Sequence, residues 1–390
     1  MSTIKQGYKQ TKVGIVPEDW EVVKVGEVLK IGSGKDYKHL STGNIPVYGT
    51  GGYMLSVNEY LYDGESVCIG RKGTIDKPMF LNEKFWTVDT LFYTHSFKKS
   101  LPKYIYLTFL SIDWQKYNEA SGVPSLSKTT IETIQIPLPP LKEQEKIAEI
   151  LTTWDEAITK QTKLLKAKEL QKKALMQKLL SGEVRFGSFN DKWNEIQVSQ
   201  VFQNIGGTSL ESEVIENGKY KFISIGNYSV DGRYIDNQQR VNLNKKTKDK
   251  LLYKDNLVMV LNDKTASGDL IGSTILINED NTFIYNQRSE RLICSNKIVP
   301  LYAWFKLNSK DFRKKIFSLS QGGTQIYINF PAVKKIKIKL PSLEEQAKIA
   351  EVLSLSDNEI NLLKKELEEL KQQKKALMQK LLTGEVRVKV

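Results

Sequence analysis

Apolar residues recur at spacings of three and four along two long stretches of this chain. In the second stretch, between residues 353 and 381, leucine and isoleucine occupy most of these positions, and Ser356 and Lys374 occupy the others. A repeat of this period belongs to a helix whose apolar stripe packs against another helix. Each stretch runs for about 39 residues without Pro or Gly, which corresponds to roughly 58 Å of helix. The pattern therefore predicts two long amphipathic helices.

The two predicted helices are copies of one sequence. The nonamer KKALMQKLL occupies residues 172–180 and again 374–382, and about 45 residues around it align without a gap at an offset of 202. Repetition over that length indicates a duplicated chain. The alternative is two unrelated surface helices. Because each apolar stripe needs a partner, we expect the two copies to pair with each other, antiparallel, so that the end of the chain returns to its first globular part.

The stripe of the first copy is more polar than that of the second, since it includes Gln161, Lys168 and Lys172. Apolar side chains at the remaining stripe positions are those that a partner helix would cover. The residues that we expect to pair the helices are Leu151, Trp154, Ile158, Leu165, Leu175, Leu179, Leu353, Ile360, Leu363, Leu367, Leu370, Leu377 and Leu381.

Strand-rich segments with many turns precede each helix. Trp20 to Gln144 spans 124 residues, whereas the matching Trp193 to Gln346 spans 153. The ends of the two segments align and their middles differ, which indicates one scaffold adapted to two targets. We expect an α+β protein in which two globular mixed α/β domains are joined by a long antiparallel coiled coil of the two repeated helices, with pseudo-two-fold symmetry. The predicted globular domains are 1–141 and 183–341. The central repeated helix is expected at 142–182, and the second repeated helix with the tail at 342–390.

Charge and composition narrow the class of protein. Across 390 residues, 58 Lys and Arg face 45 Asp and Glu, a net charge of +13, of which the two helices contribute only +2. The excess lies in the globular segments, where a nucleic acid would need it, although a basic protein can also bind anionic membrane or bind neither. No apolar run approaches the ~20 residues of a membrane span. Two isolated cysteines and no secretion signal favour a reducing, cytoplasmic location.

Glycine-bounded tips in both globular segments carry basic and amide side chains. Arg71 and Lys72, for example, lie between two glycines. Arginine and lysine grip phosphates or guanine edges, and asparagine and glutamine read adenine, although an ordinary basic turn is the alternative. The candidate DNA-binding residues are Tyr48, Thr50, Arg71, Lys72 and Thr74 in the first segment, and Asn227, Arg233, Asn262, Lys264, Thr265, Gln287 and Arg288 in the second.

Catalytic signatures are not found in the sequence. GSGKD at residues 32–36 lacks the first glycine and the Ser/Thr of a phosphate-binding loop. His39 and His95 are the only histidines, and neither has the surroundings of a nucleophile's base or of a metal centre. We therefore expect no catalytic residue, no metal site and no cofactor in this chain.

The repeated elements resemble those of a known family. PLPPLKEQEKIAEIL and LPSLEEQAKIAEVL, each followed by a helix that ends in KKALMQKLL and then GEVR, are similar to the specificity subunits of type I restriction-modification enzymes. IGRKGT and WTVDTLF (residues 86–92) are also similar to the target-recognition domains of that family. The resemblance spans nearly the whole chain. It implies a non-catalytic subunit in which each globular domain reads one half of a bipartite site in double-stranded DNA.

The same resemblance implies the partners. The paired helices would set the spacer between the half-sites and dock two methyltransferase (M) subunits, and restriction (R) subunits would complete the enzyme. S-adenosylmethionine, ATP and Mg would then be bound by those partners. The alternative left open is a duplicated-helix scaffold that assembles proteins without DNA specificity.

Overall fold

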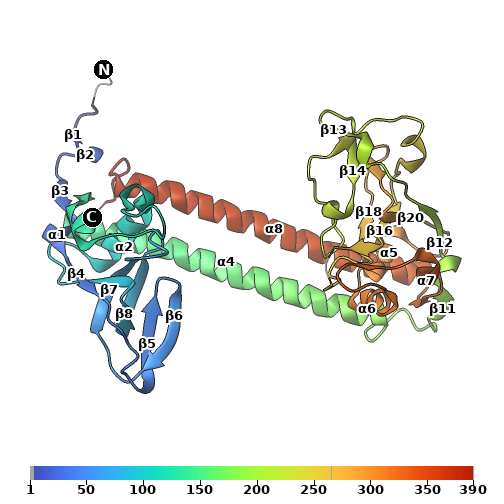
Figure 1. Ribbon diagram of the computed structural model, residues 1–390, viewed down its shortest axis with the longest axis horizontal. Coiled ribbons are helices and arrows are strands. Elements are labelled where there is room, and N and C mark those ends of the chain that lie inside the picture. The colour runs from blue at the N-terminus through green and yellow to red at the C-terminus, as the bar shows by residue number, and fades with distance from the viewer. Residues whose placement is uncertain (1–3, 265, 390) are drawn as a thin grey trace. The chain divides into compact units, whose positions relative to one another are not determined.

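The computed structural model describes residues 4–264 and 266–389 of the chain. They divide into two compact units. Unit 1 comprises Met1–Lys163 with Lys364–Val390, and unit 2 comprises Leu164–Leu363. The long helices α4 (Leu141–Ser181) and α8 (Leu343–Leu382) each contribute one half to either unit. The predicted α+β class with two long repeated helices is confirmed (Figure 1).

Unit 1 is built on a six-stranded sheet with the order β4-β9-β7-β8-β5-β6. Its neighbours are antiparallel except for β5 and β8, which run parallel. The strands are β4 (Lys30–Ser33), β5 (Thr42–Gly49), β6 (Gly52–Val57), β7 (Tyr62–Gly70), β8 (Met79–Thr87) and β9 (Leu91–His95). The other elements are β1 (Tyr8–Thr11), β2 (Gly14–Pro17), β3 (Glu21–Lys24), α1 (Val25–Val28), α2 (Pro102–Ser111), η1 (Trp114–Tyr117), α3 (Lys128–Thr133) and β10 (Gln135–Leu138).

Unit 2 contains two four-stranded sheets. The first has the order β12-β20-β16-β18, from β12 (Phe202–Gly206), β16 (Leu257–Val260), β18 (Thr274–Leu276) and β20 (Ser289–Cys294). The second has the order β13-β15-β14-β19, from β13 (Val214–Ile215), β14 (Tyr220–Ile223), β15 (Arg240–Val241) and β19 (Phe283–Tyr285).

Helices and short strands complete unit 2. They are β11 (Asn194–Gln197), β17 (Asn262–Asp263), α5 (Pro300–Leu307), α6 (Lys310–Leu319), β21 (Ile326–Tyr327), α7 (Phe330–Lys334) and β22 (Lys337–Leu340). Four 3-10 turns lie between them, η2 (Val198–Gln200), η3 (Glu211–Glu213), η4 (Ile225–Asn227) and η5 (Lys248–Lys250).

The two long helices pair antiparallel within each unit. Every residue predicted to pair them is buried or half-buried, whereas leucines off the stripe, such as Leu170 (68% exposed) and Leu362 (62%), face solvent. The polar stripe positions of α4 meet acidic residues of α8: Gln161 donates to Glu366, and Lys168 lies 2.7 Å from Glu359. Polar positions in this stripe therefore pair across the helices instead of leaving charges unmatched.

A carboxylate in the first turn of each helix is tied to the end of the other helix. Glu143 of α4 is 1% exposed and accepts hydrogen bonds from Arg387, at 2.8 and 2.9 Å, and from Trp20 Nε1 at 2.9 Å. Burying this carboxylate is tolerable because a bidentate guanidinium compensates its charge. The end of the chain thus lies in unit 1, as antiparallel pairing predicts.

The same anchor is built again in unit 2. Glu345 of α8 is 1% exposed and accepts hydrogen bonds from Arg185, at 2.8 and 2.7 Å, and from Trp193 Nε1 at 3.2 Å. Both arginines belong to the GEVR segments that follow the nonamers. The repeated sequence therefore encodes a repeated three-residue contact, which fixes both helices in the cores of the two units.

Candidate nucleic-acid interface

The basic tip of unit 1, residues 70–74, is hydrogen-bonded to two segments that are distant from it in sequence. The amide of Arg71 donates to the carbonyl of Thr90 at 2.8 Å, and its own carbonyl accepts from Leu126 N at 2.9 Å. At the first residue of β9, the carbonyl of Leu91 accepts from Gly34 N at 3.1 Å. A Cβ on Gly34 would lie 1.9 Å from the carbonyl oxygen of Val88, so only glycine permits this approach.

Unit 2 has a tip with the same connections. Leu261 N donates to Arg288 O at 2.9 Å, and Ile328 N donates to Leu261 O at 2.9 Å. Gly207 N donates to Ser289 O at 3.2 Å, and a Cβ on this glycine would lie 1.9 Å from a backbone oxygen. The segments 70–74 and 260–264 are therefore equivalent positions of one scaffold, although their side chains differ.

In unit 1 the structure brings several predicted residues together. Arg71 and Lys72 are exposed, and Thr50, at the turn between β5 and β6, lies beside Gly73 of the tip. Thr74 is half-buried within the tip. The tip borders a surface hollow whose lining includes side chains that the sequence analysis does not single out, namely Ser33, Phe92, Glu119, Ser127 and Lys128.

Tyr48 is oriented by an acidic neighbour. Its hydroxyl donates to Glu83 at 2.7 Å. Burial, together with this hydrogen bond to a carboxylate, raises the pKa of Tyr48 to about 12, so the phenol stays neutral and its proton points to Glu83. A direct contact with DNA at this residue would use the remaining lone pair of the hydroxyl oxygen.

In unit 2 the predicted tip residues converge from two segments. Lys264, Gln287 and Arg288 are exposed and Asn262 is half-buried in β17. The hydrogen bond between the two segments, described above, holds them side by side. Thr265 lies outside the described residues.

Glu211 orients the amide of Gln287. Its Oε1 accepts from Gln287 Nε2 at 3.0 Å and from the buried Asn286 Nδ2 at 2.9 Å. Partial burial opposes ionisation of Glu211, but hydrogen bonds from its own backbone amide and from these two side chains outweigh it, so the pKa of this carboxyl is lowered. The carboxylate stays ionised and fixes the direction of the Gln287 amide.

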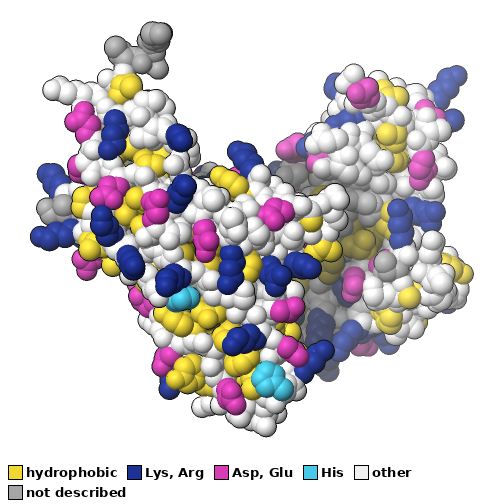
Figure 2. Space-filling view, turned by 60° about the vertical axis from the view of Figure 1, so that its left-hand side comes forward, with side chains coloured by type: hydrophobic (Ala, Val, Ile, Leu, Met, Phe, Trp, Pro, Cys, Tyr) yellow, Lys and Arg dark blue, Asp and Glu magenta, His cyan; other side chains and the backbone are white. Residues whose placement is uncertain are grey.

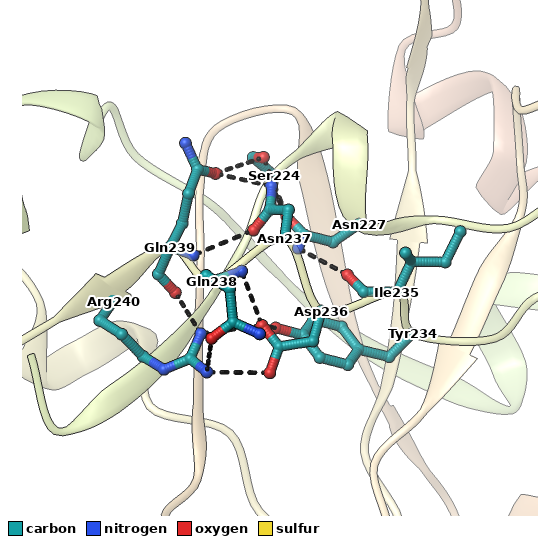
Figure 3. Close-up of polar contacts among 9 residues, drawn as sticks. All are labelled: Ser224, Asn227, Tyr234, Ile235, Asp236, Asn237, Gln238, Gln239 and Arg240. Carbon is teal, nitrogen blue, oxygen red and sulfur yellow. Dashed lines mark hydrogen bonds and ion pairs between the residues drawn. The ribbon is translucent and has the colours of Figure 1, made fainter. Parts of the chain in front are cut away.

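Two predicted residues of unit 2 are bound by other side chains or backbone of the protein. Asn227 is fully buried: its Nδ2 donates to Ile235 O at 2.8 Å and its Oδ1 accepts from Ser224 N at 2.9 Å (Figure 3). Arg233 lies 2.7 Å from Asp357 of α8 and its guanidinium stacks 5.7 Å from the ring of Trp304. The prediction of a direct DNA contact does not fit Asn227, because a side chain with no exposed surface cannot reach a base.

Figure 2 shows many Lys and Arg side chains over the visible face of unit 1, with acidic side chains between them. This distribution agrees with the basic charge of the globular segments. Among residues 4–264 and 266–389 no group of three or more His, Cys, Asp or Glu side chains is arranged to hold a metal ion. Within the same residues, no helix is both long and apolar enough to cross a membrane.

Comparisons with known proteins agree on one family. The model of the type I restriction modification DNA specificity domain matches residues 17–168 and again 190–372. The specificity subunit of the type I restriction enzyme MjaVIII from Methanocaldococcus jannaschii is 31% identical, over 99% of this chain and 97% of that protein.

Solved structures share the fold. The S subunit of a type I restriction-modification system from M. genitalium superposes with a TM-score of 0.61 at 18% identity, over 93% of this chain and 96% of that one. The HsdS subunit from Thermoanaerobacter tengcongensis gives a TM-score of 0.52 at 15% identity, over 95% and 98% of the two chains. With the family model matched twice, the chain belongs to the specificity subunits of type I restriction-modification systems.

Proposed function

We propose that this chain reads a bipartite site in double-stranded DNA, with each unit contacting one half-site through its tip. The observation that carries the proposal is the equivalence of the two tips. Arg71 and Leu261 make the same pair of backbone hydrogen bonds to equivalent segments. The predicted side chains exposed at the tip of unit 1 are Arg71 and Lys72. In unit 2 they are an amide, Gln287, with Lys264 and Arg288. One scaffold with different exposed polar side chains is suited to reading two different short sequences.

The helices would provide the spacing and the docking surface. The polar and apolar contacts along α4 and α8 make each helix half part of the core of its unit. A helix is stiff, with 1.5 Å per residue, so its length translates into a number of base pairs between the half-sites. The solvent-exposed face of the same helices is where we place two methyltransferase subunits.

We place the chemistry on the partner subunits. Methyl transfer to adenine would use S-adenosylmethionine on the methyltransferase subunits, and ATP and Mg would be bound by restriction subunits. This chain would contribute binding energy and sequence selection and no catalytic group. The assembly would act in the cytoplasm, where the DNA of its host is found.

Mapping methylated adenines in cells that carry the chain with its methyltransferase partner tests the proposal. A bipartite motif is expected. The double variant Arg71→Ala/Lys72→Ala should relax the motif in one half only, by about 10- to 100-fold in discrimination, because both changed side chains lie in unit 1. The control Lys12→Ala/Lys24→Ala removes the same charge from exposed positions of unit 1 and should leave the motif unchanged.

Salt dependence separates the proposal from a protein-assembly scaffold without DNA specificity. Binding of the assembled complex to duplex DNA should weaken steeply between 50 and 200 mM salt, as it does for proteins that contact several phosphates. An affinity that is indifferent to salt, together with the absence of a methylated motif, would favour the scaffold.

A further inference from the structure

Unit 2 contains a polar loop with no counterpart in unit 1. Gly34 to Gly70 covers 36 positions, whereas the equivalent Gly207 to Val260 covers 53. In unit 1 this interval contains β5, β6 and β7, and in unit 2 it contains β13, β14, β15 and β16, with the loop 234–239 before β15. The loop is rich in amides: Asn237, Gln238 and Gln239 follow one another.

The base of the loop is bound by Asn227 and, through the residues just before the loop, by α5 and α8. Asn227 binds the carbonyl of Ile235 through its side chain, and its own carbonyl accepts from Ile235 N at 2.8 Å. Directly before the loop, Gly232 O accepts from Trp304 Nε1 at 3.0 Å, and Arg233 is paired with Asp357. The base of the loop is therefore fixed to α5 and α8, which are rigid elements of unit 2.

At the top of the loop one amide is held with its nitrogen outward. The Oε1 of Gln239 accepts from Ser224 Oγ at 3.2 Å and from Asn237 Nδ2 at 3.0 Å. Its amide nitrogen donates to no partner in the described part of the chain. In Figure 3 this nitrogen points away from Ser224 and Asn237. Asn237 thus binds the oxygen of Gln239, and the single hydroxyl proton of Ser224 is shared between this oxygen and Asn227 Oδ1 at 3.0 Å. The outward nitrogen is therefore the group that this side chain presents to a ligand.

The backbone beside Gln239 is strained. Gln238 has a φ of 64°, a left-handed conformation that costs a non-glycine residue of the order of 1 kcal/mol and is concentrated at functional sites. Asp236 stabilises it by accepting from Gln238 N at 2.9 Å, and Arg240 lies 2.9 Å from both oxygens of Asp236. The guanidinium also neutralises a carboxylate that would otherwise repel phosphate.

Strand order places this amide close to the tip of unit 2. Phe222 N donates to Gln239 O at 3.1 Å on one side of β14, and Asn286 N donates to Ile223 O at 3.1 Å on its other side. Gln239 and the segment 286–288 are thus two strand spacings apart, about 10 Å. At ~3.4 Å per base pair this corresponds to about three base pairs.

We propose that Gln239 reads a base within the half-site of unit 2, by donating from its amide nitrogen to an acceptor in the major groove. Ser224 and Asn237 are positioning residues that hold the amide in this direction. Acceptors of guanine, of thymine or at N7 of adenine fit a pure donor, whereas the bidentate amide contact to adenine N6 and N7 requires a free oxygen as well. The inference rests on the proposed function and specifies which residue carries part of it.

The test uses the full-length chain with its methyltransferase partner and compares methylated motifs. Gln239→Ala should relax one base pair of the unit 2 half-site by about 10- to 100-fold in discrimination and leave the other half-site as it is. Gln239→Glu, which replaces the donor by an acceptor, should shift preference at that base pair towards the amino groups of cytosine or adenine. Gln203→Ala, at an exposed position of β12, is the matched control and should change nothing.

The positioning role has its own readout. Ser224→Ala should reduce discrimination at the same base pair without changing which base is preferred. A Gln239→Ala protein with the wild-type motif would overturn the inference; if Arg288→Ala still relaxed the unit 2 half-site, the proposed function would stand. A wild-type complex without any bipartite motif would overturn both. The intact unit 1 half-site in each variant shows that the complex has folded.

Discussion

Lys374 Nζ lies 2.6 Å from Asp155 Oδ1, and the residues at the same places in the other copy, Lys172 and Asp357, form the same ion pair. In a parallel, in-register pair Lys172 would lie opposite Lys374, and Asp155 opposite Asp357. The exchange of cation and carboxylate between copies therefore requires the antiparallel arrangement. Asp357 also binds Arg233 at 2.7 Å, so this carboxylate accepts from two cations.

The first prediction concerns this ion pair. Lys374→Ala should lower the free energy of unfolding by roughly 1 kcal/mol, because the lysine is only 15% exposed but its carboxylate partner is 44% exposed. A double-mutant cycle with Asp155→Ala, followed by urea unfolding, measures the coupling. Lys375→Ala, at the exposed neighbouring position, is the control. Equal losses for the two lysine variants would contradict a stabilising pair.

The second prediction concerns the tail anchor. Arg387→Ala should destabilise unit 1 by about 3 kcal/mol, because it leaves the buried Glu143 carboxylate with Trp20 as its remaining partner. Arg387→Lys should recover only part of this, since an ammonium cannot form the bidentate contact. Thermal unfolding checks both, with Lys389→Ala as the control at an exposed position. A melting temperature of Arg387→Ala equal to that of the control would show that the anchor contributes nothing.

The third prediction concerns the close approach at the tips. Gly34→Ala should destabilise unit 1 and impair recognition of its half-site, because the new Cβ would lie 1.9 Å from a backbone oxygen of Val88. Gly51→Ala is the control, since a Cβ there meets no atom within 4 Å. Thermal unfolding and the methylated motif report the two effects separately. If Gly34→Ala and Gly51→Ala behaved alike, the backbone would have to move at no cost.

The fourth prediction is a pH dependence of the loop in unit 2. The hydrogen bond from Arg240 lowers the pKa of the Asp236 carboxyl to about 2. A carboxyl whose pKa is lower in the folded state than its ordinary value of about 3.8 stabilises the fold above that value, and the contribution is lost as the pH falls towards 2.

Arg240→Gln tests this dependence. The stability difference between wild type and variant should be constant above pH 4 and shrink between pH 4 and pH 2, as measured by unfolding at each pH. Carboxyl resonances in NMR should show the pKa of Asp236 rising in the variant. A difference that stays the same down to pH 2 would mean that Asp236 is not the group involved.

Much of the architecture could be predicted from linear patterns. Apolar residues at spacings of three and four identify α4 and α8. The similarity of the two helix sequences predicts that the helices pair with each other. The stripe residues Gln161 and Lys168, which look unfavourable in sequence, pair with glutamates of the partner helix. Those partners lie in the other copy, and no local pattern shows which polar residues will meet.

The candidate interface was only partly predictable. Glycine-bounded tips with Arg and Lys are recognisable, and Arg71 and Lys72 are indeed exposed. Gln239, which we propose as a base-reading residue, was not singled out because a run of amides in a loop has no distinctive sequence signal. A comparison of the spacing between the shared glycines of the two segments could have indicated the insertion that carries it.

By itself the sequence determined the duplication, the two long helices, their antiparallel pairing and the family, because repeats and helical periodicity are properties of a linear order. Only the tertiary structure decided which polar side chains turn outward. Asn227 is buried where it binds Ile235, and Arg233 is held by Asp357, which lies 124 positions away in the sequence. Gln239 points outward because its oxygen is bound within the protein. The direction of a side chain follows from such neighbours, and only the folded chain brings them together.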